Sequence, residues 1–299
     1  MSHIKVSYLI ALYNKADFII ECIESILAEL RDVNIEICIV DDGSNDNSLN
    51  IIKKAFYTNE NILIHSFSSN KGKNTAYNKA FTMSTGEFIC IFGADDIVPL
   101  GRTKKLLKTS RENQKSVYGT ALPFYKKTKS IDRNIKKMKT SMPSFEKNLI
   151  NNLLPGGCSL IKREHADVIF PIPENLKFED WWVSYILLKR NWVTVIPDVV
   201  SYYRIHDSND CASNGSSYLS IERDYKRHFD YLDTFYKYSS SNKERIAILQ
   251  SRCLRSTFFG SKDIIQLKYL SLNKTSLKIL IFYFIGSKRY YNFKDFFIK

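Results

Sequence analysis

The sequence lacks three features that would assign it to large classes of proteins. Its apolar run Ile279–Ile285 is far shorter than the roughly 20 residues that a membrane-spanning helix needs. The first residues, MSHIKVSYLIALYNK, show no basic leader and no small-residue cleavage site, so we expect the chain to stay in the cytoplasm. The six cysteines form no C-x-x-C pair, and several stand in apolar runs, which favours buried thiols over disulfides or a zinc site.

Two common nucleotide-binding motifs are also missing. No G-x-G-x-x-G follows the first apolar segment, which argues against a dinucleotide-binding Rossmann site. The NKGKNT segment at Asn70 contains a Gly-Lys pair, but Phe67 stands where a P-loop has its upstream glycine. We therefore expect this segment to form only a turn.

The net charge of +13 is distributed unevenly. Residues 102–139 carry 13 basic and 2 acidic side chains, and residues 211–299 carry 16 and 7, whereas the other segments are acidic on balance. Such basic segments suit a phosphate-bearing partner, either lipid headgroups or nucleic acid, although a solvated lysine-rich surface is the alternative. Because no DNA- or RNA-reading motif is recognisable in them, we expect no nucleic-acid partner.

Apolar segments typical of strands and of helices alternate along the first hundred residues. The expected strands are Lys5–Tyr13, Ile35–Ser44, 61–68 and 87–96. The expected helices are Lys15–Leu30, one capped by Asn45 to Ser48, and 74–84 stopped by Gly86. This alternation predicts an α/β fold with a Rossmann-like, mainly parallel central sheet and helices on both faces. Residues 211–299 are expected to form a separate basic, helical region.

Three of the expected strands end in polar side chains, namely Asn14, Asp41 with Asp42, and Asp95 with Asp96. In parallel sheets, ligands bind beyond the carboxyl ends of the strands, so these groups should meet in one crevice. Two adjacent carboxylates repel each other, and one of them tends to stay protonated. A hard cation, Mg²⁺ or Mn²⁺, prefers oxygen ligands and would remove this repulsion. For Asp41 and Asp42, capping of the following helix is the alternative.

A second carboxylate pair, Glu179 and Asp180, stands at the start of an expected helix, before Trp181 and Trp182. The helix dipole favours carboxylates there, which is a purely structural explanation. Two tryptophans beside Asp180 are also typical of a sugar-binding cleft, because flat rings pack on sugar faces and carboxylates bind hydroxyls. Similarly, His206 is either a metal ligand or an ordinary hydrogen-bonded histidine.

These motifs resemble the family 2 glycosyltransferases, which are inverting sugar-transfer enzymes with the A-type nucleotide-diphospho-sugar fold. The resemblance covers about residues 4–210 in segments that follow the expected order: LIALYNKADFIIECIESIL, IVDDGSNDNS, NKGKNTAYNKAF with TGEFICIFGADD, FEDWWVSYILLKR and YYRIHDSN. It implies a catalytic domain over 1–210, with a nucleotide-sugar half at about 1–100 and an acceptor half at about 101–210. Three positions depart from the family pattern, because Ala11 replaces proline, Tyr77 replaces arginine and Gly93 replaces the first aspartate of Asp-x-Asp-Asp.

The resemblance also implies a role for each matching residue. The nucleotide-sugar, expected to be a UDP-sugar, would be bound by Ala11, Tyr13, Asn14, Asp41, Asp42, Lys71, Asn78, Gly93 and Asp95. The cation, Mn²⁺ or Mg²⁺, would be bound by Asp95, Asp96 and His206. The base would be Asp180, with Glu179 beside it, and the acceptor side would include Gly156, Gly157, Trp181 and Trp182.

The implied activity is metal-dependent, inverting transfer of a hexose or N-acetylhexosamine to a hydroxyl of a lipid-diphosphate-linked saccharide, as in bacterial O-antigen or capsule synthesis. Ser276–Lys299 combines aromatic residues with lysines in a pattern typical of interfacial helices, so we expect peripheral contact with an anionic membrane on its inner face. Packing of this segment on the catalytic domain is the alternative. Lys126–Thr140 is expected to be an exposed loop.

Two other classes of function remain open. A nucleotidyltransferase would need a glycine-rich, basic loop after the first strand, where this chain has ALYNKAD. In a non-catalytic nucleotide- or carbohydrate-binding module, Gly93 would mark a degenerated metal site.

Overall fold

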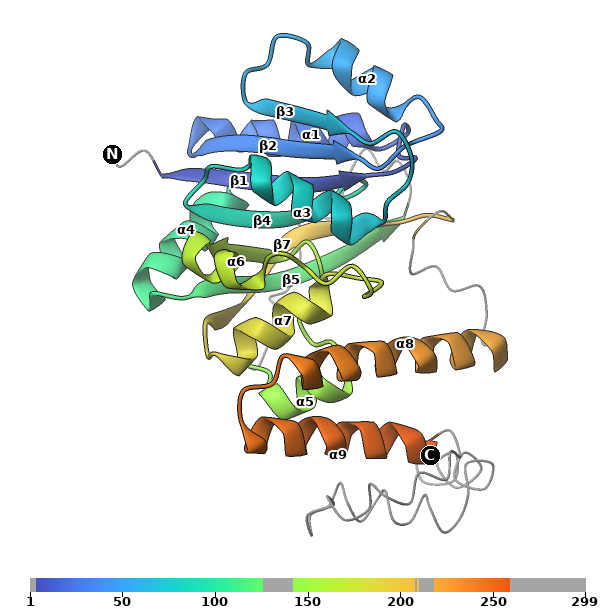
Figure 1. Ribbon diagram of the computed structural model, residues 1–299. Helices are drawn as coiled ribbons and strands as arrows, with labels where there is room; N and C mark the ends of the chain where they lie inside the picture. Colours follow the sequence, from blue (N-terminus) through green and yellow to red (C-terminus); the bar gives the residue numbers. More distant parts are fainter. Residues whose placement is uncertain (1–3, 126–141, 208, 210–217, 259–299) are drawn as a thin grey trace. The chain divides into compact units, whose positions relative to one another are not determined.

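The computed structural model describes residues 4–125, 142–207, 209 and 218–258, and its central element is a seven-stranded sheet (Figure 1). The strand order is β3-β2-β1-β4-β6-β5-β7. The strands are β1 (Lys5–Leu12), β2 (Asn34–Asp41), β3 (Ile62–Ser66), β4 (Phe88–Gly93), β5 (Ser116–Tyr125), β6 (Ser159–Lys162) and β7 (Val193–Ile205). The strands that carry the predicted polar ends, β1, β2 and β4, are therefore direct neighbours.

The first four strands form a parallel half-sheet. β1 pairs in parallel with β2 on one side and with β4 on the other, and β2 pairs in parallel with β3. Interior positions of β1 and β2 are almost all buried, because helices cover both faces of the sheet. Burial on both faces explains why these strands are nearly continuous apolar runs. The predicted Rossmann-like, mainly parallel α/β fold is confirmed.

The other half of the sheet brings a distant motif to the end of β4. β6 pairs antiparallel with both β4 and β5, and β5 pairs in parallel with β7. Just beyond β4, Ile97 forms an antiparallel bridge with Tyr202 in β7. Residues 202–207 therefore run beside the carboxylates that follow β4.

Helices flank the sheet. They are α1 (Ile19–Leu27), α2 (Ser48–Ala55), α3 (Lys73–Met83), α4 (Arg102–Asn113), α5 (Phe145–Ile150), α6 (Arg163–Ile169), α7 (Asp180–Lys189), α8 (Tyr218–Lys237) and α9 (Asn242–Phe258), with a 3₁₀ turn at Ala28–Arg31. α3 packs on β1 and β2, and Figure 1 shows it in front of the sheet with α1 behind.

Two helix boundaries differ from the sequence-based expectation. α1 begins at Ile19 instead of Lys15, because the backbone N–H groups of residues 14–16 bind side chains of residues 44–48 and do not enter a helix. α3 ends at Met83, before Gly86. Gly86 allows a close backbone approach instead, since a Cβ there would lie 2.5 Å from Ser7 Oγ.

The chain divides into two compact units. The first comprises Met1–Pro143 and Asn152–Asn214, and the second comprises Ser144–Asn151 and Gly215–Lys299. Within the second unit α9 packs on both α5 and α8, and the Ser251 hydroxyl donates a 2.7 Å hydrogen bond to the Leu149 carbonyl. The short α5 comes from the middle of the sequence but packs with the C-terminal helices. The expected boundary near residue 210 had placed it in the catalytic domain.

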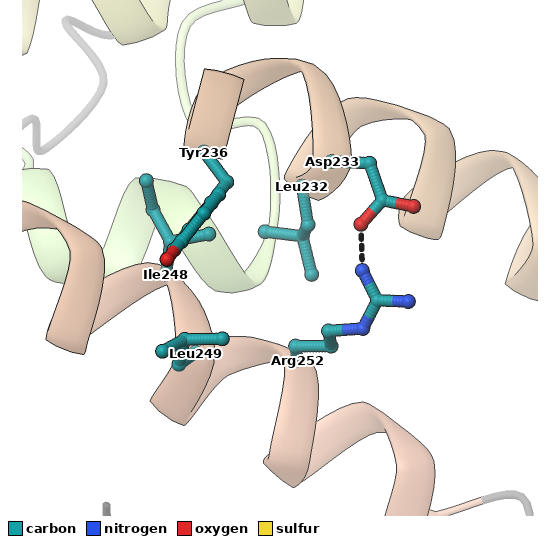
Figure 2. Close-up of a pocket in the computed structure, with 6 residues that line it drawn as sticks. All are labelled: Leu232, Asp233, Tyr236, Ile248, Leu249 and Arg252. Carbon is teal, nitrogen blue, oxygen red and sulfur yellow. Dashed lines mark ion pairs between the residues drawn. The ribbon is translucent and has the colours of Figure 1, made fainter. Parts of the chain in front are cut away.

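The second unit contains a small cavity of about 230 Å³ between α8 and α9. Figure 2 shows its lining residues Leu232, Asp233, Tyr236, Ile248, Leu249 and Arg252, with an ion pair between Arg252 and Asp233. None of the predicted site residues lines this cavity.

Further expectations concern the thiols and two charged segments. Cys22, Cys38, Cys90 and Cys158 are buried free thiols, as expected. In the part of the chain that the structure describes, no helix has the length and apolar character to cross a membrane. The expected loop Lys126–Thr140 and the expected interfacial segment Ser276–Lys299 lie outside the described residues.

Candidate active site

The carboxyl ends of β1, β2 and β4 lie at one edge of the sheet. In the strand register, Ala11 of β1 stands opposite Val40 of β2 on one side and Gly93 of β4 on the other. The polar residues that follow these strands therefore start from adjacent positions. The predicted convergence of the three strand ends is seen in the structure.

Asp41 and Asp42 hold the loops around the end of β2. Asp42 accepts hydrogen bonds from the backbone N–H groups of Lys71 (2.6 Å) and Gly72 (3.0 Å). Asp41 accepts one from the Ser66 hydroxyl at 3.0 Å. Burial raises the pKa of Asp42, although the two N–H groups oppose the shift. The predicted nucleotide-binding carboxylates thus already position the loop before α3.

Gly43 permits this loop to come close. Its φ is +69°, and a Cβ on it would lie 2.6 Å from the backbone carbon of Ser69. A side chain would therefore collide with main-chain atoms that cannot rotate away. Lys71, another predicted nucleotide-binding residue, is exposed, and its ammonium lies 4.6 Å from the centre of the Phe67 ring.

A tight turn after β1 joins the nucleotide side to the predicted metal side. Asn14 has a φ of +52°, and its Oδ1 accepts hydrogen bonds from the backbone N–H groups of Asn45 (2.8 Å) and Asp46 (3.3 Å). Tyr13 beside it is 40% exposed, so its ring is available to a ligand. The next residue, Lys15, forms a 2.9 Å ion pair with Asp95 Oδ2. Lys15 was not among the predicted site residues, although it stands directly after Asn14 in the quoted motif.

Asp95 and Asp96 form the first carboxylate centre. His206 Nε2 lies 3.0 Å from Asp95 Oδ2, and the Arg204 backbone N–H donates to Asp96 Oδ1 at 3.0 Å. Burial raises the pKa of Asp95, but Lys15 and His206 lower it by more, so the net direction is downward. Burial and the neighbouring Asp95 carboxylate raise the pKa of Asp96 to about 7. Asp95 is thus a charged carboxylate paired with Lys15, whereas Asp96 takes up a proton more readily than a free aspartate, because burial and Asp95 outweigh the opposing effects of Lys73 and Arg204.

Arg204 organises this centre and was not predicted, although it lies in the same motif as His206. Its side chain is fully buried, its Nε donates to the Asp95 carbonyl at 2.8 Å, and it forms a 2.6 Å ion pair with Glu21 of α1. Its guanidinium also lies over the rings of Phe18 and Phe124. These contacts fix the backbone on which both aspartates stand.

Gly93 faces the two carboxylates directly. A Cβ at this position would lie 2.9 Å from Asp96 Oδ2 and 3.1 Å from Asp95 Oδ1. The side chain that the family usually carries here would therefore enter the space that the aspartate pair occupies. Because Gly93 has no side chain, the Asp95 and Asp96 carboxylates can occupy this space.

Asp180 and Glu179 form the second carboxylate centre, at the start of α7. Asp180 Oδ1 accepts a 2.8 Å hydrogen bond from the Trp181 backbone N–H, and Glu179 Oε2 lies 3.1 Å from the Lys73 ammonium. Burial, followed by the Glu179 carboxylate, raises the pKa of Asp180 from 3.8 to about 6, although Lys73 and the Asn152 side chain oppose the shift. A carboxylate with such a pKa can both stay ionised near neutral pH and accept a proton.

Gly156 and Gly157 connect the two centres. A Cβ on Gly156 would lie 3.6 Å from Glu179 Oε1 and 3.8 Å from Asp180 Oδ2, whereas one on Gly157 would lie 3.6 Å from Asp96 Oδ2. Two consecutive residues without side chains therefore separate the centres. Gly157 also has a φ of +73°, a conformation that favours glycine.

Three predicted site residues have other roles in the structure. Trp181 and Trp182 are only 4% and 2% exposed, and Trp182 Nε1 donates a 2.8 Å hydrogen bond to the Ile169 carbonyl, so neither ring forms an open sugar-binding surface. The amide of Asn78 exchanges two hydrogen bonds with the backbone of Ile172 (2.9 and 2.7 Å). The expectation for the tryptophans is corrected, because both belong to the core, and the Asn78 amide positions the segment before α7.

The donor atoms fit a hard cation only in part. Within the residues that the structure describes, no three His, Cys, Asp or Glu side chains are arranged as a metal site. His206 binds Asp95 instead of converging with both aspartates as a third ligand. A pair of carboxylates is nevertheless what Mg²⁺ and Mn²⁺ sites commonly offer, because water and substrate phosphates complete the coordination. Asp95 and Asp96 therefore fit such an ion.

The chain has an α/β fold with two carboxylate centres, one after β4 and one at the start of α7. A family model described as "Glycosyl transferase family 2" matches residues 7–170. The chain belongs to this family, and it is a glycosyltransferase with the A-type fold.

Two relatives illustrate the family. An uncharacterized glycosyltransferase, alr2836, from Nostoc sp. (strain PCC 7120) is 28% identical over 71% of this chain and 68% of its own length. The minor teichoic acid biosynthesis protein GgaB from Bacillus subtilis is 24% identical over 92% of this chain. The match spans only 29% of GgaB, so this chain corresponds to less than a third of that protein.

Solved structures share the fold. S. aureus TarS 1–349 in complex with UDP-GlcNAc superposes with a TM-score of 0.64 at 18% identity, covering 92% of this chain and 79% of that one. The mannosyltransferase PcManGT from Pyrobaculum calidifontis, in complex with GDP-Man and Mn²⁺, has a TM-score of 0.60 at 18% identity, covering 92% and 74%.

Proposed function

We propose that this chain catalyses metal-dependent, inverting transfer of a hexose or N-acetylhexosamine from a UDP-sugar to a hydroxyl group of a saccharide acceptor. One observation carries the proposal: the carboxylate pair Asp95–Asp96 and the carboxylate Asp180 lie on either side of the consecutive glycines 156 and 157. Such an arrangement suits a leaving diphosphate at one centre and an attacking hydroxyl at the other.

The nucleotide would lie at the ends of β1 and β2. Asp42 and Asp41 supply carboxylate oxygens there, and the exposed ring of Tyr13 offers a surface for stacking. Lys71, on the loop that Asp42 binds, would supply a positive charge near the phosphates. Uracil has a ring N–H that can donate a hydrogen bond to a carboxylate. TarS 1–349, which shares the fold, has been solved with UDP-GlcNAc.

The cation would be held by Asp95 and Asp96, with His206 orienting Asp95. When bound, Mn²⁺ or Mg²⁺ supplies Lewis-acid stabilisation of the leaving diphosphate. The chain itself fixes the two carboxylates through Arg204, whose backbone N–H binds Asp96 and whose side chain binds the Asp95 carbonyl. PcManGT, a fold relative, has been solved with GDP-Man and Mn²⁺.

Asp180 would remove the proton from the acceptor hydroxyl. Its raised pKa, about 6, lies near the range in which a general base is both ionised and sufficiently basic. Lys73 neutralises Glu179 beside it, and Asn152 and the Trp181 N–H hold the Asp180 carboxylate in place. Attack by the hydroxyl opposite the departing diphosphate is a single displacement, which inverts the anomeric configuration.

We infer that the acceptor is a growing bacterial surface polysaccharide carried on a lipid diphosphate. Support comes from GgaB, whose name places it in minor teichoic acid biosynthesis. The basic and aromatic composition of Ser276–Lys299 supports peripheral attachment at the inner face of the cell membrane.

A donor screen tests this proposal. The full chain is incubated with Mn²⁺ or Mg²⁺ and a panel of nucleotide sugars, and the released nucleoside diphosphate is measured, with Asp96→Ala and Asp180→Asn as variants. The exposed Asp167, in α6, provides the control variant Asp167→Asn. Release from one UDP-sugar that requires the metal and Asp96 is expected. Once a saccharide acceptor is supplied, Asp180→Asn should lose transfer, and NMR of the wild-type product should show an inverted anomeric centre. Equal release from Asp96→Ala or without metal would contradict the metal-dependent mechanism.

A further inference from the structure

The ammonium of Lys15 lies 2.9 Å from Asp95 Oδ2, at the predicted cation site. Both side chains are largely shielded from water, with exposures of 15% for Lys15 and 14% for Asp95. An ion pair in such a place is much less weakened by solvent than a surface pair. Lys15 is therefore a substantial part of the local charge around Asp95.

The backbone at Lys15 is firmly anchored. Its N–H donates to Ser48 Oγ at 2.9 Å, and the N–H groups of Asn14 and Ala16 donate to Ser44 Oγ and Asp46 Oδ2, both at 3.0 Å. On the other side, the Lys15 carbonyl accepts hydrogen bonds from the backbone N–H groups at the start of α1. The attachment point of the ammonium therefore stays beside both the nucleotide side and the cation side.

Several groups surround the aspartate pair, and the Lys15 ammonium is the one that forms an ion pair with Asp95 from the turn after β1, while His206 Nε2 lies 3.0 Å from the same oxygen. Arg204 is engaged with Glu21 in its own 2.6 Å ion pair, and it meets Asp96 through its backbone N–H. With Lys15 in place, an incoming cation meets two carboxylates and one ammonium. With the ammonium gone, the same cation meets the two carboxylates with one positive charge less beside Asp95.

We propose that Lys15 is a tethered counter-ion of Asp95 that competes with the divalent cation and moves to the diphosphate when the nucleotide binds. This inference rests on the proposed function of the site. Asp95 Oδ2 cannot serve the ammonium and the cation equally well, because the two positive charges repel each other. Phosphate oxygens of the nucleotide would give the displaced ammonium a new partner, since lysine binds phosphate as a point charge. Cation and nucleotide would therefore bind cooperatively.

Cooperative binding of this kind is measurable as a coupling factor. If the nucleotide relieves the competition at Asp95, it must raise the affinity for the cation, and the cation must raise the affinity for the nucleotide by the same factor. Removing the ammonium should then raise the affinity for the cation alone on the order of tenfold and reduce the coupling factor by a similar amount.

The test is titration of the full chain with Mn²⁺, followed by electron paramagnetic resonance of free Mn²⁺, in the absence and presence of UDP. The variants are Lys15→Met, which removes the charge, and Lys15→Arg, which retains it. Lys104→Met is the matched control, because it removes an exposed lysine whose ion pair is with Asp32. All backbone hydrogen bonds of Lys15 remain available in its variants, and circular dichroism checks that each is folded.

We expect Lys15→Met to bind Mn²⁺ about tenfold more tightly than the wild type without UDP, and to lose most of the enhancement by UDP. Lys15→Arg and Lys104→Met should both keep the weak, UDP-dependent binding of the wild type. If Lys15→Met matches Lys104→Met while UDP still enhances Mn²⁺ binding, the role of Lys15 is refuted and the proposed metal-dependent function stands. If the wild type binds no Mn²⁺ even with UDP, both ideas fail.

Discussion

Replacement of Asp180 by asparagine should strongly slow transfer and, at the same time, stabilise the protein in a pH-dependent manner. The pKa of this carboxyl is raised from 3.8 to about 6 by burial and by Glu179. A tenfold change in proton affinity corresponds to about 1.4 kcal/mol, so ionising Asp180 costs the folded state about 3 kcal/mol more than the unfolded chain. Asparagine keeps the shape of the side chain and carries no charge, so it should avoid most of this cost.

The direction of the pH dependence follows from the raised pKa. Below pH 3.8 the carboxyl is protonated in both the folded and the unfolded state, and the wild type loses nothing. Between pH 3.8 and 6 only the unfolded chain ionises, so the wild type loses stability as the pH rises, and above pH 6 the loss is complete. The advantage of Asp180→Asn should thus be about 3 kcal/mol at pH 8 and about half of that at pH 5.

Urea unfolding of both proteins at pH 5 and pH 8 measures this difference, with Asp167→Asn as the exposed control. In parallel, the transfer rate should fall on the order of 10²- to 10⁴-fold, while UDP affinity stays unchanged. The wild-type kcat/KM should decline tenfold per pH unit below about pH 6. A stability gain that is equal at both pH values, or a variant that still transfers sugar at the wild-type rate, would refute the assignment of Asp180 as a buried base.

Three further perturbations address the metal centre and the core. Asp96→Ala should remove the Mn²⁺-dependent part of UDP binding in calorimetry, and unchanged binding would show that the carboxylate pair does not hold the cation. Trp182→Phe should lower the free energy of unfolding, measured in urea, by about 1–3 kcal/mol, because the hydrogen bond from the indole N–H to the Ile169 carbonyl is lost. The KM for the acceptor should not change. A raised KM with unchanged stability would mean that the ring does contact the acceptor. Gly119→Ala, in β5, should lower the free energy of unfolding by about 1–3 kcal/mol, because a Cβ there would lie 2.5 Å from Val200 Cγ2. An unchanged midpoint of urea unfolding would contradict this steric clash.

Much of the parallel half-sheet, β1 to β4, can be predicted from the sequence alone. The runs that form β1, β2 and β4 are largely apolar without alternation, which is typical of a strand covered on both faces. The carboxylates Asp41 and Asp95 follow these runs directly, so their position at one sheet edge follows from the parallel topology. Local pattern and chain direction suffice for such predictions.

The sequence is less informative about which aromatic and amide side chains meet a ligand. Trp182 stands two positions after Asp180, yet neighbouring residues of a helix point in different directions, and its ring packs into the core. Asn78 matches a family motif, but its amide binds the backbone of Ile172, 94 residues away. Proximity in sequence and motif membership identify a segment without identifying where each side chain points.

The partners of the charged groups were decided by the tertiary structure alone. Lys15 meets Asp95 across 80 positions of sequence, Lys73 meets Glu179, and His206 reaches Asp95 across 111. A lysine on a polar segment has the same pattern whether it faces water or a buried carboxylate. Only tertiary packing brings these charges together and removes water from them. Burial raises the pKa of both Asp95 and Asp96, and the values separate because Lys15 and His206 lower that of Asp95 while the Asp95 carboxylate raises that of Asp96 further.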